Sequence, residues 1–219
     1  MFIFNKRVIL MKSSGIDEAG RGPVLGPMVI VGILIDTSKL ETLKFFKVRD
    51  SKMISRNVRT RLMKVINEII DAKEIIEVWP SEIDEKNKQG ISLNVLERIK
   101  MADIILKLKP ERVFVDCPDI KPERFKKLLL KDVNFCCPII AEHNADKKYI
   151  EVSAASIIAK VHRDEIINRL REEYGDFGSG YPSDSKTINF LKKWYKEHQS
   201  WPSIVRKSWK TLERIIKEV

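Results

Sequence analysis

The sequence of 219 residues has only three cysteines and no long apolar run. Cys136 and Cys137 are adjacent and Cys117 stands apart, a spacing that fits neither a disulfide framework nor a zinc site, so we expect buried free thiols. No apolar run approaches the roughly 20 residues that cross a bilayer. The first residues also lack the layout of a secretory signal. We therefore expect a cytoplasmic protein with no membrane partner.

Glutamine is rare as well, with two in the chain, whereas 33% of the residues are charged. The net charge is +10, and such a basic surplus favours an anionic partner, most often nucleic acid. Half of the surplus lies in residues 179–219, which carry nine lysines and arginines against four acids. Aromatic residues lie among these cations and can stack on bases or form the core of a small helical unit. We favour the core for Trp209 and leave Tyr181 open.

Hydrophobic periodicity divides the first part of the chain into alternating strands and helices. Strands are expected at residues 28–35, 74–79, 113–116 and 138–141. Helices are expected at 55–70, from Ser92 with a buried stripe of Val95, Ile99, Ala102 and Leu106, from Pro122, and at 153–174, where Gly175 ends the helix. This alternation predicts an α/β layered domain.

The pattern changes after the glycine-rich residues 175–180. Two helices are expected beyond them, near residues 184–198 and 207–219, and no further strand. We therefore expect a catalytic domain at residues 1–178, in which residues 1–10 are an N-terminal extension. Residues 179–219 are expected to form a basic, helical, substrate-binding extension.

The segment GIDEAGRGPVLGP, residues 15–27, holds four glycines, two prolines and the adjacent carboxylates Asp17 and Glu18. Glycines let a backbone approach a ligand closely, and they surround Arg21, a side chain suited to phosphate. A surface turn with an exposed acidic pair is the alternative. The segment is not a Walker loop, because no Gly-Lys-Ser/Thr follows the glycines.

Further acids lie at the ends of other predicted strands. Asp116 ends residues 113–116, and Glu142 and Asp146 follow residues 138–141. Neighbouring strand ends can bring such carboxylates together, where they repel one another and raise each other's pKa unless a cation lies between them. Oxygen ligands select Mg²⁺ or Mn²⁺ rather than zinc. With a nucleic acid substrate, the expected chemistry is phosphoryl transfer with two ions.

Several motifs, in order and spacing, resemble those of the ribonuclease HII family. They are GIDEAGRGPVLG at 15–26, DSK at 50–52, VFVD at 113–116, AEHNAD at 141–146, VSAASIIAK at 152–160, RD at 163–164 and GSGYPSD at 178–184. The ending RKSWKT, residues 206–211, is similar to the archaeal branch. The resemblance runs from about Gly15 to Thr211 and implies a ribonuclease H-like fold, with a mixed five-stranded sheet flanked by helices and a C-terminal helical extension.

The resemblance also implies an activity and its ligands. Members of the family hydrolyse the RNA strand of RNA/DNA hybrids, including single ribonucleotides embedded in duplex DNA, and leave a 3′-hydroxyl and a 5′-phosphate. The catalytic metal ligands, for Mg²⁺ or Mn²⁺, would be Asp17, Glu18, Asp116 and Asp146. We expect a monomer, and the sequence leaves open whether a sliding clamp is a partner.

Substrate recognition is implied by other positions of the same motifs. Gly20, Arg21 and Gly22 would read the ribose 2′-hydroxyl with backbone atoms. Tyr181 would stack on the sugar of the next nucleotide and favour an RNA-to-DNA junction. By weaker local matches, Lys52 and Asn94 are candidates for phosphate contacts.

One alternative concerns the fourth ligand, and two concern the function. Asp119 or Glu142 could replace Asp146, which would then be an exposed loop acid. A second function would be a different metal nuclease or a phosphotransferase with the same fold. The presence of both Gly20-Arg21-Gly22 and Tyr181 speaks against it. A non-catalytic hybrid-binding protein would gain nothing from four acids facing phosphates.

Other polar residues invite catalytic roles that simpler explanations cover. His143 and His162 could act as bases, but we expect surface or packing roles, since two-metal chemistry does not require a histidine. Ser153 and Ser156 could be nucleophiles, but no acid–histidine arrangement accompanies them. We expect these serines to cap the start of a helix.

Overall fold

The protein, described here by a computed structural model over residues 11–48 and 55–218, is built on one mixed sheet. Its strand order is β3–β2–β1–β4–β5. The strands are β1 (Lys12–Ala19), β2 (Met28–Asp36), β3 (Ala72–Val78), β4 (Arg112–Asp116) and β5 (Ile139–Glu142). The first three pair antiparallel, whereas β1 with β4 and β4 with β5 pair parallel. The predicted mixed five-stranded sheet is confirmed; the expected extension at residues 1–10 lies outside the described residues.

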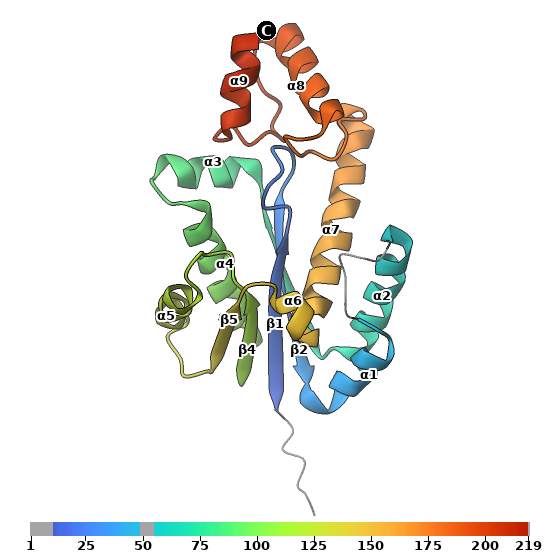
Figure 1. The fold of residues 1–219 in the computed structure, drawn as a ribbon, viewed down its shortest axis with the longest axis vertical. Helices are drawn as coiled ribbons and strands as arrows, with labels where there is room; N and C mark the ends of the chain where they lie inside the picture. The colour runs from blue at the N-terminus through green and yellow to red at the C-terminus, as the bar shows by residue number, and fades with distance from the viewer. Residues whose placement is uncertain (1–10, 49–54, 219) are drawn as a thin grey trace, which may run out of the picture.

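Helices cover both faces of this sheet (Figure 1). One face carries α1 (Leu40–Phe45) after a short 3₁₀ turn (Thr37–Lys39), α2 (Arg56–Ile69) and the long α7 (Ile150–Tyr174). The other carries α4 (Leu93–Leu108) and α5 (Pro122–Val133), with α3 (Pro80–Lys88) above them in Figure 1. The short α6 (Ala145–Lys148) precedes α7, and α8 (Ser185–His198) and α9 (Lys210–Glu218) follow it. No described helix has the length and apolar character needed to span a membrane.

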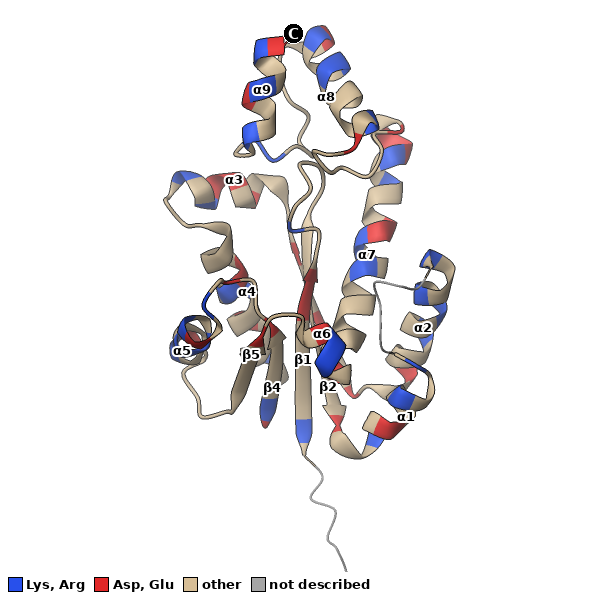
Figure 2. Ribbon diagram, in the orientation of Figure 1, with Lys and Arg blue, Asp and Glu red and all other residues tan. Residues whose placement is uncertain are grey.

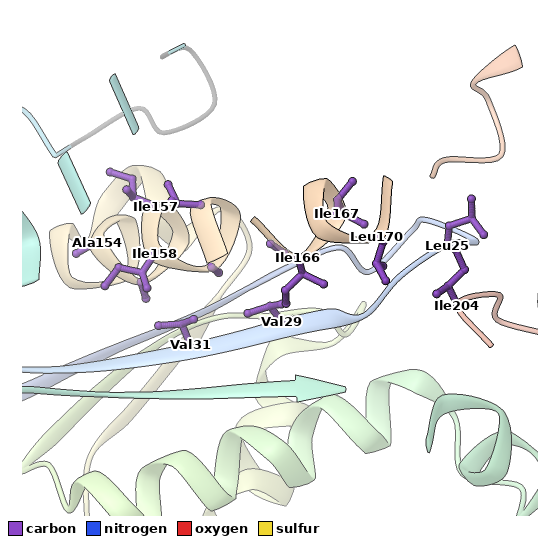
Figure 3. Packing of buried hydrophobic residues seen from close by; sticks show 14 of the residues in the cluster. Leu25, Val29, Val31, Ala154, Ile157, Ile158, Ile166, Ile167, Leu170 and Ile204 are labelled. Carbon is purple, nitrogen blue, oxygen red and sulfur yellow. The ribbon is translucent and has the colours of Figure 1, made fainter. Parts of the chain in front are cut away.

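Burial on both faces explains why β2 carries no polar side chain from Met28 to Ile35. Val29 and Val31 pack against Ile158 and Ile166 of α7, as Figure 3 shows, whereas Ile30 belongs to the cluster under α4 and α5. Each such side chain contributes roughly 1.5–3 kcal/mol when fully buried. The predicted strand at residues 28–35 is therefore confirmed by the pairing and by its physical cause.

The C-terminal segment shares this core. Ile204 lies beside Leu25 (Figure 3), and Leu25 also forms an isolated antiparallel bridge with Val205. Leu212 and Ile215 of α9 are buried in the same cluster as Val29 and Val31. Trp209 packs against the clusters on both faces of the sheet, as the core interpretation of this residue predicts. Residues 179–219 therefore have no separate hydrophobic core, and their role as a substrate-binding extension remains a proposal.

Two details of the predicted helices are wrong. The stripe predicted for α4 is wrong in phase at Ile99 and Leu106, which are exposed, although Ala102 is buried as expected. Leu96, Met101 and the acid Glu97 are buried instead. The cause is that α4 has apolar residues on several sides, and the buried face includes a carboxylate. In addition, α3 (Pro80–Lys88) follows β3 directly, where we expected no helix from the sequence.

Two predictions for small side chains are also wrong. Helix α7 begins at Ile150, so Ser153 and Ser156 lie inside it and cap nothing. Both are fully buried, and the Ser153 hydroxyl donates a hydrogen bond to the carbonyl of Val48. All three cysteines are free, as predicted, but Cys136 is exposed.

Candidate active site

The first two acids follow from the pairing of β1 with β4. The parallel register pairs Ile16 with Val115, so Asp17 and Asp116 come next on the two neighbouring strands. Asp17 is buried, and its pKa is raised to about 7, first by burial and then by the negative charge of Asp116. A hydrogen bond from Ser156 and the charge of Lys160 oppose that rise. The sequence prediction that strand ends bring these acids together is supported by this geometry.

Glu18 follows Asp17 on β1, where successive side chains point to opposite faces of the sheet. Burial raises its pKa well above the usual value, and the charges of Asp17 and Glu97 raise it further. Its Oε2 atom is buried and has no hydrogen-bond partner among the described residues. A carboxylate oxygen in this position is costly unless a cation or a donor reaches it.

Asp116 is hydrogen-bonded to the start of α6, the short helix that carries Asp146. The Asp116 Oδ1 atom accepts a hydrogen bond of 3.1 Å from the backbone amide of Ala145. Asp146, the next residue, is 4% exposed, so it is not the exposed loop acid of the alternative interpretation. Its burial, one residue after the amide that binds Asp116, favours Asp146 as the fourth acid.

The two competing acids are held by cations of the protein itself. Asp119 accepts hydrogen bonds from Arg124 at 2.6 and 2.8 Å and from the Lys121 amide at 2.9 Å. Glu142 forms an ion pair with Lys148 and accepts a hydrogen bond of 2.9 Å from the Tyr149 hydroxyl. These contacts occupy their carboxylate oxygens, which disfavours both as the fourth ligand.

The donor set fits a hard divalent cation. The carboxylates of Asp17, Glu18 and Asp116 repel one another, and the buried Oε2 atom of Glu18 has no hydrogen-bond partner among the described residues. A bound cation would relieve both costs. Within residues 11–48 and 55–218, no three His, Cys, Asp or Glu side chains already surround a single point where an ion could sit. The oxygen chemistry of Asp17, Glu18, Asp116 and Asp146 therefore carries the inference, and it favours Mg²⁺ or Mn²⁺ over zinc.

A cleft of about 330 Å³ opens beside Glu18. It is lined by residues 18–22 and by Arg59, Lys160, Arg163, Asp164 and Tyr181. Residues 20–27, which join β1 to β2, are called the glycine-rich loop from here on. Tyr181 lies on this loop: a Cβ atom built on Gly22 would be 3.4 Å from its Cε1 atom.

Backbone contacts fix Tyr181 relative to the glycine-rich loop. The carbonyl of Gly180, the residue before it, accepts hydrogen bonds from the amides of Val24 at 2.8 Å and Leu25 at 3.3 Å. The Gly180 amide donates to the Thr187 hydroxyl of α8 at 3.0 Å. The ring is 42% exposed, so it remains available for stacking.

Arg21 and Asn94 contact each other rather than standing apart as two phosphate ligands. The Arg21 Nε atom donates to both oxygens of the fully buried Glu97, at 2.9 and 3.0 Å, and its Nη2 atom donates to the Asn94 side chain. The Asn94 side chain also lies near Asp119. Lys52, the other candidate for phosphate contact, lies outside the described residues.

Sequence reasoning missed Glu97, Arg59 and Lys160. Burial raises the pKa of Glu97 to about 7, against the opposing influence of Arg21. A signal for Glu97 exists in the sequence, a carboxylate between the apolar residues of α4, but we assigned it no role from the sequence. Lys160 lies within a matched motif but received no role, and nothing in the sequence around Arg59 marks it.

The histidines take structural positions. His143 is exposed, with Nδ1 3.2 Å from the Cys117 carbonyl oxygen, and His162 Nε2 lies 2.6 Å from Glu77. Neither lines the cleft beside Glu18.

Comparison with known proteins agrees with this geometry. The family model described as Ribonuclease HII matches residues 14–212. A ribonuclease HII from Thermococcus sibiricus is 49% identical over 94% of this chain and 91% of its own length. Among solved structures, the ribonuclease H2 from Pyrococcus horikoshii OT3 superposes with a TM-score of 0.89 at 43% identity, covering 95% of this chain and 98% of the other.

Two further structures extend the comparison. The structure titled as the PCNA:RNase HII complex from Archaeoglobus fulgidus gives a TM-score of 0.85 at 42% identity, covering 93% and 96% of the two chains. Bst-RNase HIII in complex with Mn²⁺ gives 0.81 at 17% identity, covering 95% of this chain and 70% of that one, and shares the fold. The chain thus belongs to the ribonuclease HII family, metal-dependent hydrolytic endonucleases that act on RNA/DNA hybrids.

Proposed function

We propose that this enzyme also cuts duplex DNA at single embedded ribonucleotides, by two-metal-ion hydrolysis that leaves a 3′-hydroxyl and a 5′-phosphate. Asp17, Glu18, Asp116 and Asp146 would hold the ions. When bound, Mg²⁺ or Mn²⁺ activates the attacking water and stabilises the leaving oxygen. The burial of Asp17 and Glu18 and their raised pKa values support this assignment, because a cation would relieve the repulsion.

The other residues of the cleft would bind the substrate. Gly20, Arg21 and Gly22 would contact the ribose 2′-hydroxyl with backbone atoms. Arg59 and Lys160 line the same cleft and would bind backbone phosphates. We retain the phosphate contact of Asn94 as a weaker proposal, since its side chain already bonds Arg21.

The observation that carries the proposal is the contact between Gly22 and Tyr181. A ring 3.4 Å from the position of a Gly22 Cβ atom leaves a narrow path along the glycine-rich loop. A ribose whose 2′-hydroxyl meets the loop would place the next sugar at Tyr181. Stacking there is compatible with a deoxyribose, so one ribonucleotide would be enough.

The test is cleavage of a duplex with one embedded ribonucleotide, beside a continuous RNA/DNA hybrid and an all-DNA duplex of the same sequence. We expect cleavage of the first two with Mg²⁺ or Mn²⁺ and none with chelator. End labelling would identify the 3′-hydroxyl and 5′-phosphate. Cleavage of the hybrid without cleavage at the single ribonucleotide would refute the junction activity.

A sliding clamp is a candidate partner. The relative from Archaeoglobus fulgidus, at 42% identity, was solved as a complex with PCNA. We propose that this chain binds a clamp of the same kind. Co-elution of the two purified proteins in size-exclusion chromatography would support this, and separate elution at micromolar concentrations would contradict it. The same experiment on the enzyme alone tests the expected monomer.

A further inference from the structure

One buried arginine from the end of the chain holds the glycine-rich loop by its carbonyl groups. Arg206, in the segment between α8 and α9, is fully buried against the glycine-rich loop. Its side chain donates three hydrogen bonds, to the carbonyls of Gly20 at 2.6 Å, Arg21 at 2.9 Å and Gly26 at 3.0 Å. Its own backbone amide donates to the Val24 carbonyl at 2.9 Å. The guanidinium thus spans both ends of the loop.

Trp209 holds the carbonyl that Arg206 does not reach. Its Nε1 atom donates to the carbonyl of Gly22 at 3.2 Å. Its ring also packs on the Arg206 guanidinium, 4.9 Å from the ring centroid, which fixes the two side chains against each other. A second buried arginine, Arg163 of α7, holds the far end of the loop by its Leu25 and Pro27 carbonyls at 3.2 Å each.

The geometry of the peptide bond then sets the direction of two amides. The described chain has no cis peptide bond, and in a planar trans peptide the carbonyl and the following N–H point in opposite directions. The Gly20 carbonyl faces Arg206, so the Arg21 N–H points away from Arg206. The Gly22 N–H points away for the same reason, because the Arg21 carbonyl faces Arg206.

The Arg21 and Gly22 amides are available to a ligand. The amides of Val24, Leu25 and Gly26 donate to backbone carbonyls, and residue 23 is a proline. Among the described residues, none accepts a hydrogen bond from the amide of Arg21 or Gly22. Residues 20–22 line the cleft, whereas Arg206 does not.

We propose that Arg206 and Trp209 are positioning residues for recognition of the ribose 2′-hydroxyl: they bind the carbonyl side of residues 20–22 and thereby present the Arg21 and Gly22 amides to the substrate. The proposal rests on the proposed role of this loop. Glycines make the loop adaptable, so without these anchors the two amides would sample other directions. A site that hydrogen-bonds a hydroxyl discriminates strongly only if its polar groups are fixed in advance.

The test removes one hydrogen bond and keeps the packing. Trp209→Phe deletes the Nε1 donor to Gly22 but retains an aromatic ring over Arg206. Trp194→Phe is the matched control, because the Trp194 indole N–H is buried with no hydrogen-bond partner among the described residues. For each protein, kcat/KM is measured on the one-ribonucleotide duplex with Mg²⁺. The inhibition constant of an all-DNA duplex measures the affinity of the enzyme for a duplex that lacks the 2′-hydroxyl.

We expect Trp209→Phe to lower kcat/KM by about two- to tenfold, the range of one hydrogen bond, with an unchanged inhibition constant for DNA. Trp194→Phe should change neither quantity. A parallel loss of both quantities in Trp209→Phe, an equal loss in Trp194→Phe, or an unchanged kcat/KM in Trp209→Phe would each overturn the proposal.

Two further measurements keep this result separate from other failures. If the wild-type enzyme does not cut the one-ribonucleotide duplex, the junction activity is wrong, and the same comparison on a continuous RNA/DNA hybrid still tests the anchors. Arg206→Lys keeps the charge but loses the planar fork, so a folded variant should lose more kcat/KM than Trp209→Phe. A folded Arg206→Lys with wild-type kcat/KM would overturn the role of Arg206.

Discussion

Asp17 and Asp116 lie side by side, each one residue beyond the last parallel pair of β1 and β4. The negative charge of Asp116 is the second cause, after burial, that raises the pKa of Asp17 to about 7. Two ionised carboxylates at these positions repel each other and destabilise the folded state. Figure 2 shows that the acidic residues on β1 lie in the middle of the sheet, away from the basic helices at the C-terminal end. A cation bound between the acids would therefore affect both catalysis and stability.

The first prediction concerns catalysis. Asp17→Asn and Asp116→Asn should each lower cleavage of an RNA/DNA hybrid by at least about a thousandfold, because an amide is a poor ligand for a hard cation. Binding of the hybrid should persist. Asp119→Asn is the matched control, since Arg124 already holds that acid, and it should remain active. Turnover near the wild-type rate in the Asp17 or Asp116 variant at saturating Mg²⁺ would contradict the assignment.

The second prediction concerns pH. The pKa of Asp17 is raised from 3.8 to about 7 in the folded state, so its favourable contribution is present below pH 3.8 and is lost as pH rises through about 7. In chelator, the melting temperature should therefore fall as pH rises between about 5 and 8. Asp17→Asn should flatten this dependence. Mn²⁺ should raise the melting temperature at about pH 8 in the wild type more than in the variant.

The window chosen for that measurement avoids opposing groups. Ion pairs and hydrogen bonds lower the pKa of Asp36 and Asp184, so their contributions are lost at acidic pH, below the usual carboxylate range. A wild-type melting temperature that rises steadily with pH from about 5 to 8 in chelator would show that Asp17 is ionised without cost.

The third prediction concerns stacking at the junction. Tyr181→Ala should lower cleavage at a single ribonucleotide by about tenfold or more, because aromatic stacking on a nucleotide contributes about 1–3 kcal/mol. Tyr181→Phe keeps the ring and should stay near wild type. Calorimetric titration of Mn²⁺ should give the same affinity for all three proteins. Equal junction cleavage by Tyr181→Ala and wild type would leave Tyr181 with a packing role only.

The fourth prediction contrasts two glycines of the same loop. A Cβ on Gly20 would lie 2.0 Å from the Arg163 Nε atom, and Gly20 has a φ of +83°, so Gly20→Ala should lower the melting temperature by several degrees. Gly22 is not among the glycines with positive φ, and its added Cβ would meet only the Tyr181 ring at 3.4 Å. Gly22→Ala should fold normally but cut the one-ribonucleotide duplex several-fold more slowly. A normal rate would show that the ring moves aside freely.

The fifth prediction concerns the basic surplus of the extension. Lys193 and Lys196 are exposed on α8, one of the two basic helices at the top of Figure 2. If they contact phosphates, changing both to Gln should lower the slope of log affinity against log salt by about 1 to 2. Lys107→Gln removes a charge from α4, where the lysine bonds Glu74, and should leave the slope unchanged. An unchanged slope in the double variant would show that these two lysines do not contact phosphates.

Strands β2 to β5 were predictable because each carries a local signal, whereas no local pattern predicted β1 (Lys12–Ala19), which was expected only through the family resemblance. Continuous apolar runs with β-branched residues mark residues 28–35, and the acids that end the strands follow directly from their positions. Helix α4 was harder, because its buried face includes Glu97, whose charge is offset by Arg21 from a loop 76 residues away. This ion pair between Arg21 and Glu97 forms only in the tertiary structure, so the local periodicity of the sequence does not indicate it. The phase of α4 was misread for this reason.

The role of Arg206 was hidden for a related cause. The sequence shows it as one of nine cations in a basic segment, and by composition a solvent-exposed position is the natural expectation. Its burial becomes intelligible only with the glycine-rich loop in place, since three carbonyls there satisfy its donors. The motif RKSWKT marked the segment as similar to the archaeal branch without indicating what it contacts.

The bond between Arg206 and Gly20 joins residues 186 positions apart. During synthesis, β1 and its loop leave the ribosome long before the residue that fixes them. Closing so long a connection has an entropic cost and belongs to the late, non-local steps of folding. A nascent or prematurely terminated chain would therefore lack the anchor of its recognition loop, even with the four acids already present. The order of synthesis alone would delay ribonucleotide recognition until residues 206–209 have been made.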